Sequence, residues 1–169
     1  VEAGRGKAPA VMVVRDGPLL LVTLNRPSVL NAITREVTAS VAAAMDELEE
    51  DPALRVAILT GAGGNFSAGM DLAAFQVDDF PDVGDRGFGG ITARPPAKPV
   101  IAAVEGYALA GGFEIALAAD LIVAAEGAQF GLPEVRRGLF AAAGGLARLG
   151  SALPYQTAAR IALLGDMYS

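Results

Sequence analysis

Cysteine and histidine are both absent from this chain of 169 residues. Without cysteine there are no disulfides, thiolate nucleophiles or cysteine-type zinc sites. Without histidine there are no Ser-His-Asp triads, histidine metal sites or imidazole acid–base chemistry. Chemistry carried by this chain alone must therefore use carboxylates, lysine or tyrosine as proton carriers, or depend on oriented backbone dipoles. We expect no metal.

Basic residues are also scarce: 13 Lys and Arg stand against 19 Asp and Glu, for a net charge of −6. No basic patch stands out, so we expect no nucleic-acid partner. No uncharged apolar run approaches the roughly 18 residues of a membrane span, and the first residues contain no apolar signal core. We therefore expect a cytoplasmic protein without a membrane partner, with residues 1–10 a flexible tail and 11–169 one core domain.

Short apolar runs alternate with helical patterns along the chain, which predicts an α/β fold with largely buried strands. Asp16-Gly17 between two β-rich runs predicts a hairpin of 11–15 and 19–24. We expect further strands at 56–60, 100–104 and 121–125. Helices are expected from a cap at Thr34 to about Glu50, at 115–119, and from about 154 to 164. A short helix is expected within 69–75, a mobile loop over 76–94, and a glycine-rich segment up to Gly150.

Two glycine turns carry the strongest chemical signal. One is FSAGMDL at 66–72 and the other is LAGG at 109–112. Each follows a strand and opens a helix, so an N–H from each, if the turns face one another, would hold one oxygen that gains negative charge. Glu114 and Glu134 are then a candidate acid and base. The alternative for each glutamate is a structural carboxylate at a helix start.

Three other patterns are weaker. Gly61-x-Gly63 has Phe66 where a dinucleotide fingerprint needs its third glycine. Ser67 lacks both the nucleophile elbow and a histidine base, so we interpret it as structural. The aspartates between 76 and 94 lack EF-hand spacing, and a solvated acidic loop is the simpler interpretation; they are Asp78, Asp79, Asp82 and Asp85.

Several ordered motifs resemble the enoyl-CoA hydratase/isomerase (crotonase) family. They are NRPSVLNA at 25–32, FSAGMDL at 66–72, KPVIAAVEGYA at 98–108, AAD at 118–120 and FGLPE at 130–134. The resemblance runs from about Val11 to the end of the chain. It implies a crotonase (ClpP-like) α/β fold of repeated ββα units. The family's C-terminal helical region, which helps cover CoA and build a trimer, is expected to be missing here.

By position, the resemblance implies that the backbone N–H groups of Met70 and Gly111 form an oxyanion hole for an acyl-CoA thioester. Glu114 and Glu134 match the two glutamates of the hydratases. The residues implied to bind CoA are Val29, Leu30, Ala32, Ala68, Asp71 and Leu72. Ser28 replaces a Lys or Arg common in the first CoA loop, so part of the phosphate contact must come from elsewhere.

The implied activity is that of an enoyl-CoA hydratase, a lyase of fatty acid metabolism that adds water reversibly to a 2-enoyl-CoA. Coenzyme A is part of the substrate, and no separate cofactor is expected. The expected assembly is a homotrimer or a dimer of trimers. The alternatives are Δ3,Δ2-enoyl-CoA isomerisation with Glu134 as the single proton shuttle, another crotonase-family reaction, and a non-catalytic acyl-CoA-binding protein. The residues leave open which glutamate is acid and which is base.

Overall fold

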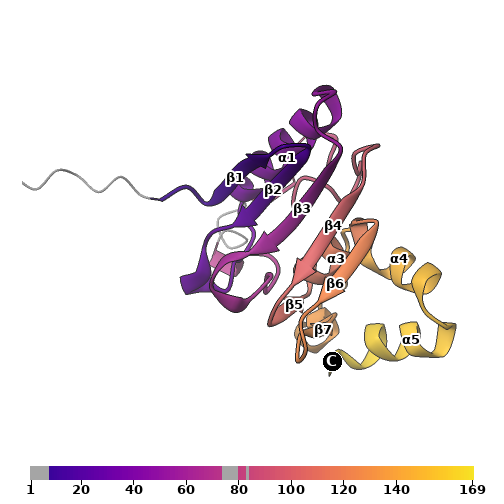
Figure 1. Ribbon diagram of the computed structural model, residues 1–169. Helices are drawn as coiled ribbons and strands as arrows, with labels where there is room; N and C mark the ends of the chain where they lie inside the picture. Colours follow the sequence, from indigo (N-terminus) through magenta and orange to yellow (C-terminus); the bar gives the residue numbers. More distant parts are fainter. Residues whose placement is uncertain (1–7, 74–79, 83) are drawn as a thin grey trace, which may run out of the picture.

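The computed structural model describes residues 8–73, 80–82 and 84–169, and its centre is a five-stranded sheet (Figure 1). The strand order is β1-β2-β3-β4-β6. The strands are β1 (Val11–Asp16), β2 (Leu19–Leu24), β3 (Val56–Gly61), β4 (Val100–Val104) and β6 (Leu121–Ala124). β1 and β2 form the antiparallel hairpin that the sequence predicts, and the other neighbours pair in parallel.

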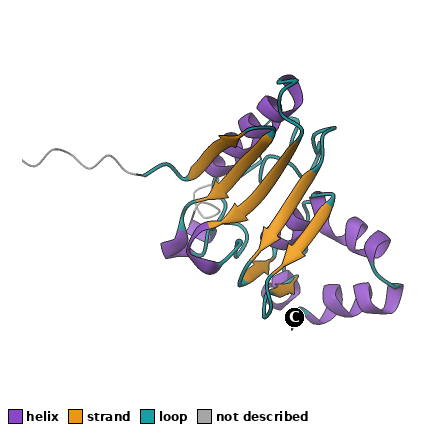
Figure 2. Ribbon diagram, in the orientation of Figure 1, coloured by secondary structure: helices purple, strands orange, loops and turns teal. Residues whose placement is uncertain are grey.

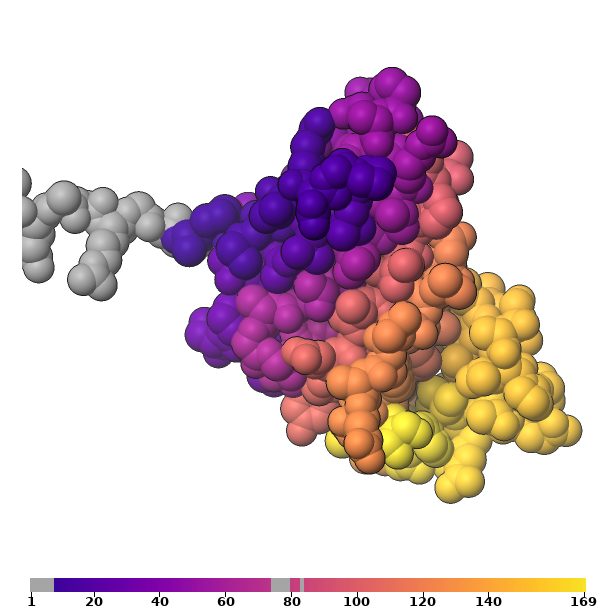
Figure 3. All heavy atoms as spheres, in the orientation of Figure 1, coloured from indigo at the N-terminus to yellow at the C-terminus, as the bar shows by residue number. Residues whose placement is uncertain are grey.

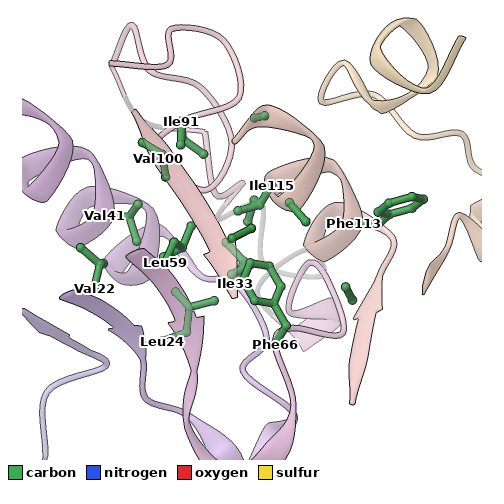
Figure 4. Packing of buried hydrophobic residues seen from close by; sticks show 14 of the residues in the cluster. Val22, Leu24, Ile33, Val41, Leu59, Phe66, Ile91, Val100, Phe113 and Ile115 are labelled. Carbon is green, nitrogen blue, oxygen red and sulfur yellow. The ribbon is translucent and has the colours of Figure 1, made fainter. Parts of the chain in front are cut away.

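Two helices lie against one face of this sheet and enclose the core (Figure 2). α1 (Arg35–Glu50) begins at Thr34, whose Oγ1 accepts a 3.3 Å hydrogen bond from the N–H of Val37, as the predicted cap requires. α3 (Gly111–Ala118) is buried on almost every side. Alternate residues of the strands point toward these helices and make the packed layer of Figure 4; examples are Val22, Leu24, Leu59 and Val100.

A second, smaller sheet was not expected from the sequence. It contains β5 (Tyr107–Leu109), β7 (Gln129–Gly131) and β8 (Met167–Tyr168), in that order. Among the described residues, short 3-10 helices complete the turns: η1 (Pro27–Val29), η2 (Ala62–Gly64) and η3 (Pro133–Arg137). This small sheet holds β5 directly before α3, and so fixes where α3 begins.

The C-terminal part of the chain forms two helices that stand beside the sheet (yellow in Figures 1 and 3). α5 (Tyr155–Leu164) is the predicted last helix. α4 (Gly145–Ala152) lies in the predicted glycine-rich segment, where no helix was expected. Gly144, at φ 90°, ends the turn before α4. The high helix propensity of residues 146–149 then outweighs the low propensity of Gly145 and Gly150.

The described part of the 76–94 segment is irregular, as predicted, and its aspartates Asp82 and Asp85 are exposed, as expected for a solvated acidic loop. Residues 86–92 are instead packed into the core, where Arg86 and Ile91 are 1% and 0% exposed. Residues 76–79, with Asp78 and Asp79, lie outside the described residues. Of the helix expected within 69–75, Leu72 and Ala73 are helical and the last two residues lie outside.

The structure describes the predicted tail, residues 1–10, only from residue 8 onward. Of the predicted tail, residues 1–7 lie outside the described residues, whereas Ala10 is buried and its carbonyl accepts a 2.8 Å bond from the N–H of Asn25. Ala10 therefore belongs to the core. In the ranges that the structure describes, no helix is both long and apolar enough to cross a membrane.

Candidate active site

A pocket of about 800 Å³ lies where the two glycine turns meet η3 and the 84–94 segment. Its walls include all four of the residues predicted to do chemistry: Met70, Gly111, Glu114 and Glu134. These residues come from three separate stretches of the chain, at Met70, at the start of α3 and at Glu134, and the fold brings them to one cavity.

The two turns meet because the first one runs alongside β5. Ser67 forms a parallel bridge with Ala108, and its N–H and carbonyl bond to Tyr107 and Leu109 at 2.8 and 3.0 Å. A Cβ at Gly112 would lie 2.3 Å from the carbonyl oxygen of Ser67. Glycine at this position therefore lets the first turn contact the start of α3 directly.

Met70 and Gly111, which line this pocket, have backbone N–H groups without an acceptor among the described residues. Gly111 is the first residue of α3, after Ala110 in the left-handed region at φ 51°. The positive end of the α3 dipole therefore adds to the positive electrostatic potential at the Gly111 N–H. Such a pair of donors suits an oxygen that gains negative charge.

Glu114 lies in the first turn of α3 and is 3% exposed. Its Oε1 accepts a 2.8 Å hydrogen bond from the N–H of Gly145, at the start of α4. Burial raises the pKa of Glu114, and the Gly145 hydrogen bond and the charge of Arg148 oppose that rise. The carboxylate is thus buried but held in place by a donor.

Glu134 lies in η3 directly after Pro133 and has a different environment. Its Oε2 is buried and, among the described residues, has no hydrogen-bond partner. Burial raises the pKa of Glu134 to about 7, with a further contribution from the charge of Glu114. A carboxyl group with this pKa exchanges its proton readily at neutral pH.

Ser67 has the structural role that the sequence predicts. Its Oγ donates to the carbonyl of Asn31 at 2.9 Å and accepts from the N–H of Gly69 at 3.1 Å. The same side chain is completely buried. Its hydroxyl therefore shapes the first glycine turn.

The residues predicted to bind CoA divide into two groups. Two of them, Ala68 and Leu72, line the pocket. The other four lie outside its walls: Val29, Leu30, Ala32 and Asp71. They are still adjacent to the first glycine turn. The N–H of Ala68 donates to the carbonyl of Leu30 at 2.9 Å, and Arg26 bonds both the Ala32 carbonyl at 2.6 Å and Asp71 at 2.9 Å.

Sequence reasoning missed most of the apolar wall. The large side chains that complete it are Phe80, Phe88, Leu139 and Phe140, and Arg137 adds a charge. They lie in irregular or 3-10 segments, where no helical or strand period marks a buried face. No group of acidic side chains within the described ranges is arranged to hold a metal.

The fold and the pocket define an α/β protein whose site combines backbone N–H donors with a pair of carboxyl groups. Residues 15–169 match the enoyl-CoA hydratase/isomerase family. The chain belongs to this family, and its fold is the crotonase fold predicted from the motifs.

Similar proteins include several hydratases and dehydratases. The chain is 48% identical over 163 residues to mevalonyl-coenzyme A hydratase SIDH of Beauveria bassiana, covering 89% of this chain and 58% of that protein. It is 49% identical over 146 residues to carnitinyl-CoA dehydratase of Salmonella enteritidis, covering 84% of this chain and 56% of that protein. The crystal structure of enoyl-CoA hydratase EchA1 from Mycobacterium marinum superposes with a TM-score of 0.93 at 55% identity. The match covers 95% of this chain and 64% of that chain. The chain thus spans less than two thirds of these relatives.

Proposed function

We propose that the protein adds water reversibly to the double bond of a 2-enoyl-CoA thioester. The observation that carries this proposal is that one pocket is bordered by two residues whose N–H groups have no acceptor among the described residues, and by two carboxyl groups with raised pKa values. The hydratase and dehydratase names of the similar proteins support the same reaction class. Assembly as a homotrimer or a dimer of trimers and a cytoplasmic location stay predictions.

In this proposal, the thioester carbonyl oxygen accepts hydrogen bonds from Met70 and Gly111. Addition of an oxygen nucleophile at the β carbon moves electrons toward the carbonyl and creates an enolate. The two N–H groups stabilise that charge without having to reorganise. Removing one donor of this kind typically costs about 100- to 1000-fold in rate.

The carboxyl pair carries one proton before the reaction. Glu114, held by Gly145, takes a proton from water as the water oxygen bonds to the β carbon. Glu134 gives its own proton to the α carbon. The pair still holds one proton afterwards, now on Glu114. The higher pKa at Glu134 supports this assignment, because the group of higher pKa holds the shared proton first.

Double-bond isomerisation is the second candidate, and one observation favours it. The unpartnered Oε2 of Glu134 and its pKa of about 7 suit a group that takes a proton from one carbon and returns it to another. That reaction does not need Glu114. Hydration needs both carboxyl groups, so the two activities separate on the Glu114→Gln variant.

The test compares Glu114→Gln and Glu134→Gln with the wild type on crotonyl-CoA, with a 3-enoyl-CoA as the second substrate. We expect kcat for hydration to fall by about 100- to 10,000-fold in each variant. Glu36→Gln is the matched control, since Glu36 is another first-turn glutamate, in α1 and away from the pocket. Near-normal hydration in both glutamate variants would contradict the proposal. Full isomerisation by Glu114→Gln without hydration by the wild type would favour the alternative.

A further inference from the structure

Arg86 is the largest side chain among the fully buried residues, with 1% of its surface exposed. It belongs to the irregular segment 86–94, called here the wall loop, which lies on α1. A buried guanidinium is costly unless its charge is paired and its N–H groups are satisfied. The hydrogen-bond and ion-pair partners of Arg86 therefore show which segments this side chain holds together.

The guanidinium joins the wall loop to α1. Its Nε donates to Oδ1 of Asp46 at 2.8 Å, and Nη2 pairs with Glu49 one turn further along the helix. Its Nη1 donates to the carbonyl of Arg94 at 2.8 Å, while the Arg86 carbonyl accepts from the N–H of Ala93 at 2.9 Å. Arg86 thus holds both ends of the wall loop as well as the helix.

Backbone contacts place the middle of the wall loop directly on α1. The N–H of Gly89 donates to Oγ1 of Thr38 at 3.2 Å. A Cβ at Gly90 would lie 2.4 Å from the backbone nitrogen of Ala42, so the loop contacts the helix at backbone distance. Arg94, the last residue of the loop, pairs with the same two acids, Asp46 at 3.3 Å and Glu49 at 3.0 Å, from a side chain that is 43% exposed.

The wall loop presents Phe88 to the pocket. A Cβ at Gly111 would lie 2.5 Å from Cε1 and Cζ of Phe88, so the ring rests against Gly111 itself. Thr92 and Ala93, from the same loop, also line the pocket. If Gly111 holds the thioester carbonyl, the acyl group begins beside this ring, and Phe88 is a wall for its first carbons.

We propose that Arg86 is a positioning residue that sets acyl-group selectivity by fixing the wall loop on α1 with Phe88 against Gly111. The inference rests on the proposed function for its substrate class. Arg86 touches no substrate and acts through Phe88. Apolar pockets discriminate a single methylene by about 10- to 200-fold only when their walls are fixed. Without the buried pairs of Arg86 to Asp46 and Glu49, the wall loop depends on the exposed pairs of Arg94, and it loses that discrimination.

The experiment measures kcat/KM on 2-enoyl-CoA substrates of four to twelve carbons for the wild type, Arg86→Met, Arg86→Lys and Phe88→Ala. The ratio between the best and the poorest chain length is the readout, because a smaller folded fraction cancels in it. We expect this ratio to fall about tenfold or more in Arg86→Met and Phe88→Ala, with an intermediate value in Arg86→Lys, which keeps the charge.

Arg15→Met is the matched control. Arg15 also pairs with acids at the C-terminal end of α1, Glu47 within the helix and Asp51 directly after it, but it reaches them from β1 and its side chain is 54% exposed. We expect it to keep the wild-type ratio. A wild-type ratio in folded Arg86→Met, or an equal fall in Arg15→Met, would overturn the proposal. If Arg86→Met does not fold, a wild-type ratio in both Arg86→Lys and Phe88→Ala overturns it instead.

The positioning role of Arg86 can also be tested if the proposed hydratase function fails. If the wild type turns over no enoyl-CoA, the same variants are compared by the Kd values of butyryl-CoA and decanoyl-CoA. The ratio of these two Kd values is then the readout. A changed ratio in Arg86→Met and Phe88→Ala supports the positioning role without hydration, and an unchanged ratio rejects it.

Discussion

The N–H of Gly145 donates a 2.8 Å hydrogen bond to Oε1 of Glu114, so the start of α4 holds a buried carboxylate that belongs to α3. The contact is close enough to require glycine. A Cβ at position 145 would lie 2.6 Å from Cγ and 2.9 Å from Oε1 of Glu114. The glycine therefore supplies both the donor and the space that the carboxylate occupies.

Gly145→Ala should displace Glu114 and lower kcat for hydration by about 10- to 100-fold, since small misplacements of catalytic groups have effects of this size. Gly150→Ala is the control in the same helix, because a Cβ there meets nothing within 4 Å. We expect Gly150→Ala to keep full activity and to gain up to about 1 kcal/mol in unfolding free energy. Equal hydration rates for the two variants would refute the role of Gly145.

The raised pKa of Glu134 predicts a specific pH dependence. Hydration needs one proton on the pair, with Glu134 protonated and Glu114 ionised. Above about pH 7 Glu134 loses its proton, so kcat/KM for hydration should fall there. At lower pH Glu114 gains a proton, and kcat/KM should fall again. Because the product state of the pair also holds one proton, dehydration should follow the same profile.

This profile is measured from pH 4.5 to 9.5 in both directions with the wild type. Above neutral pH, the expected slope of log kcat/KM is −1. A flat profile up to pH 9 would mean that Glu134 does not act as the acid. If kcat/KM rose with pH for one of the two reactions, hydration or dehydration, and fell for the other, the result would contradict a single proton shared by Glu114 and Glu134.

Regular elements were predictable from the sequence where local pattern alone determines them. The β1–β2 hairpin follows from Asp16-Gly17, and α1 follows from its cap and one apolar face. The small sheet could not be predicted, because strands of two or three residues show no period. α4 was missed since glycines at both ends of the segment concealed its helical centre.

The members of the candidate site were predictable from the sequence, but the contacts that support them were not. The motifs indicated both glutamates and both N–H groups, and the structure brings them to one pocket. The supporting contacts join Glu114 to Gly145, 31 residues later, and Asp46 to Arg86, 40 residues later. Neither partner has a local pattern that identifies the other. Such contacts follow only from the packed tertiary structure.

Asn31 should contribute strongly to stability. The residue is 1% exposed; its Oδ1 accepts from the N–H of Arg26 at 2.8 Å, and its Nδ2 donates to the carbonyls of Ala62 and Asn65 at 2.9 and 2.7 Å. Asn31→Ala leaves these groups unpaired, at about 1–3 kcal/mol each. We expect a loss of about 3 kcal/mol or more in urea unfolding.

Asn25→Ala is the comparison for Asn31, because it removes one exposed hydrogen bond, to the carbonyl of Pro9. Its cost should stay below about 1 kcal/mol. Similar losses for the two variants would show that Asn31 does not join its three neighbouring segments as the structure indicates.

Asp71 tests the predicted CoA segments. Its 2.9 Å ion pair with Arg26 joins the 25–32 loop to the first glycine turn. Asp71→Asn should raise KM for crotonyl-CoA about 3- to 10-fold with little change in kcat, the signature of lost uniform binding. Asp16→Asn, at the exposed end of β1, should change neither. A fall in kcat at constant KM would place Asp71 in the chemical step instead.

In the proposed function, the N–H groups of Met70 and Gly111 together hold the thioester carbonyl. The most direct measurement is the infrared stretching frequency of a ¹³C-labelled carbonyl in crotonyl-CoA bound to Glu134→Gln, which should bind without turning it over. Two donors and the α3 dipole polarise the carbonyl, so its frequency should be lower than that of free crotonyl-CoA in water. A bound frequency equal to or above the free value would contradict the account.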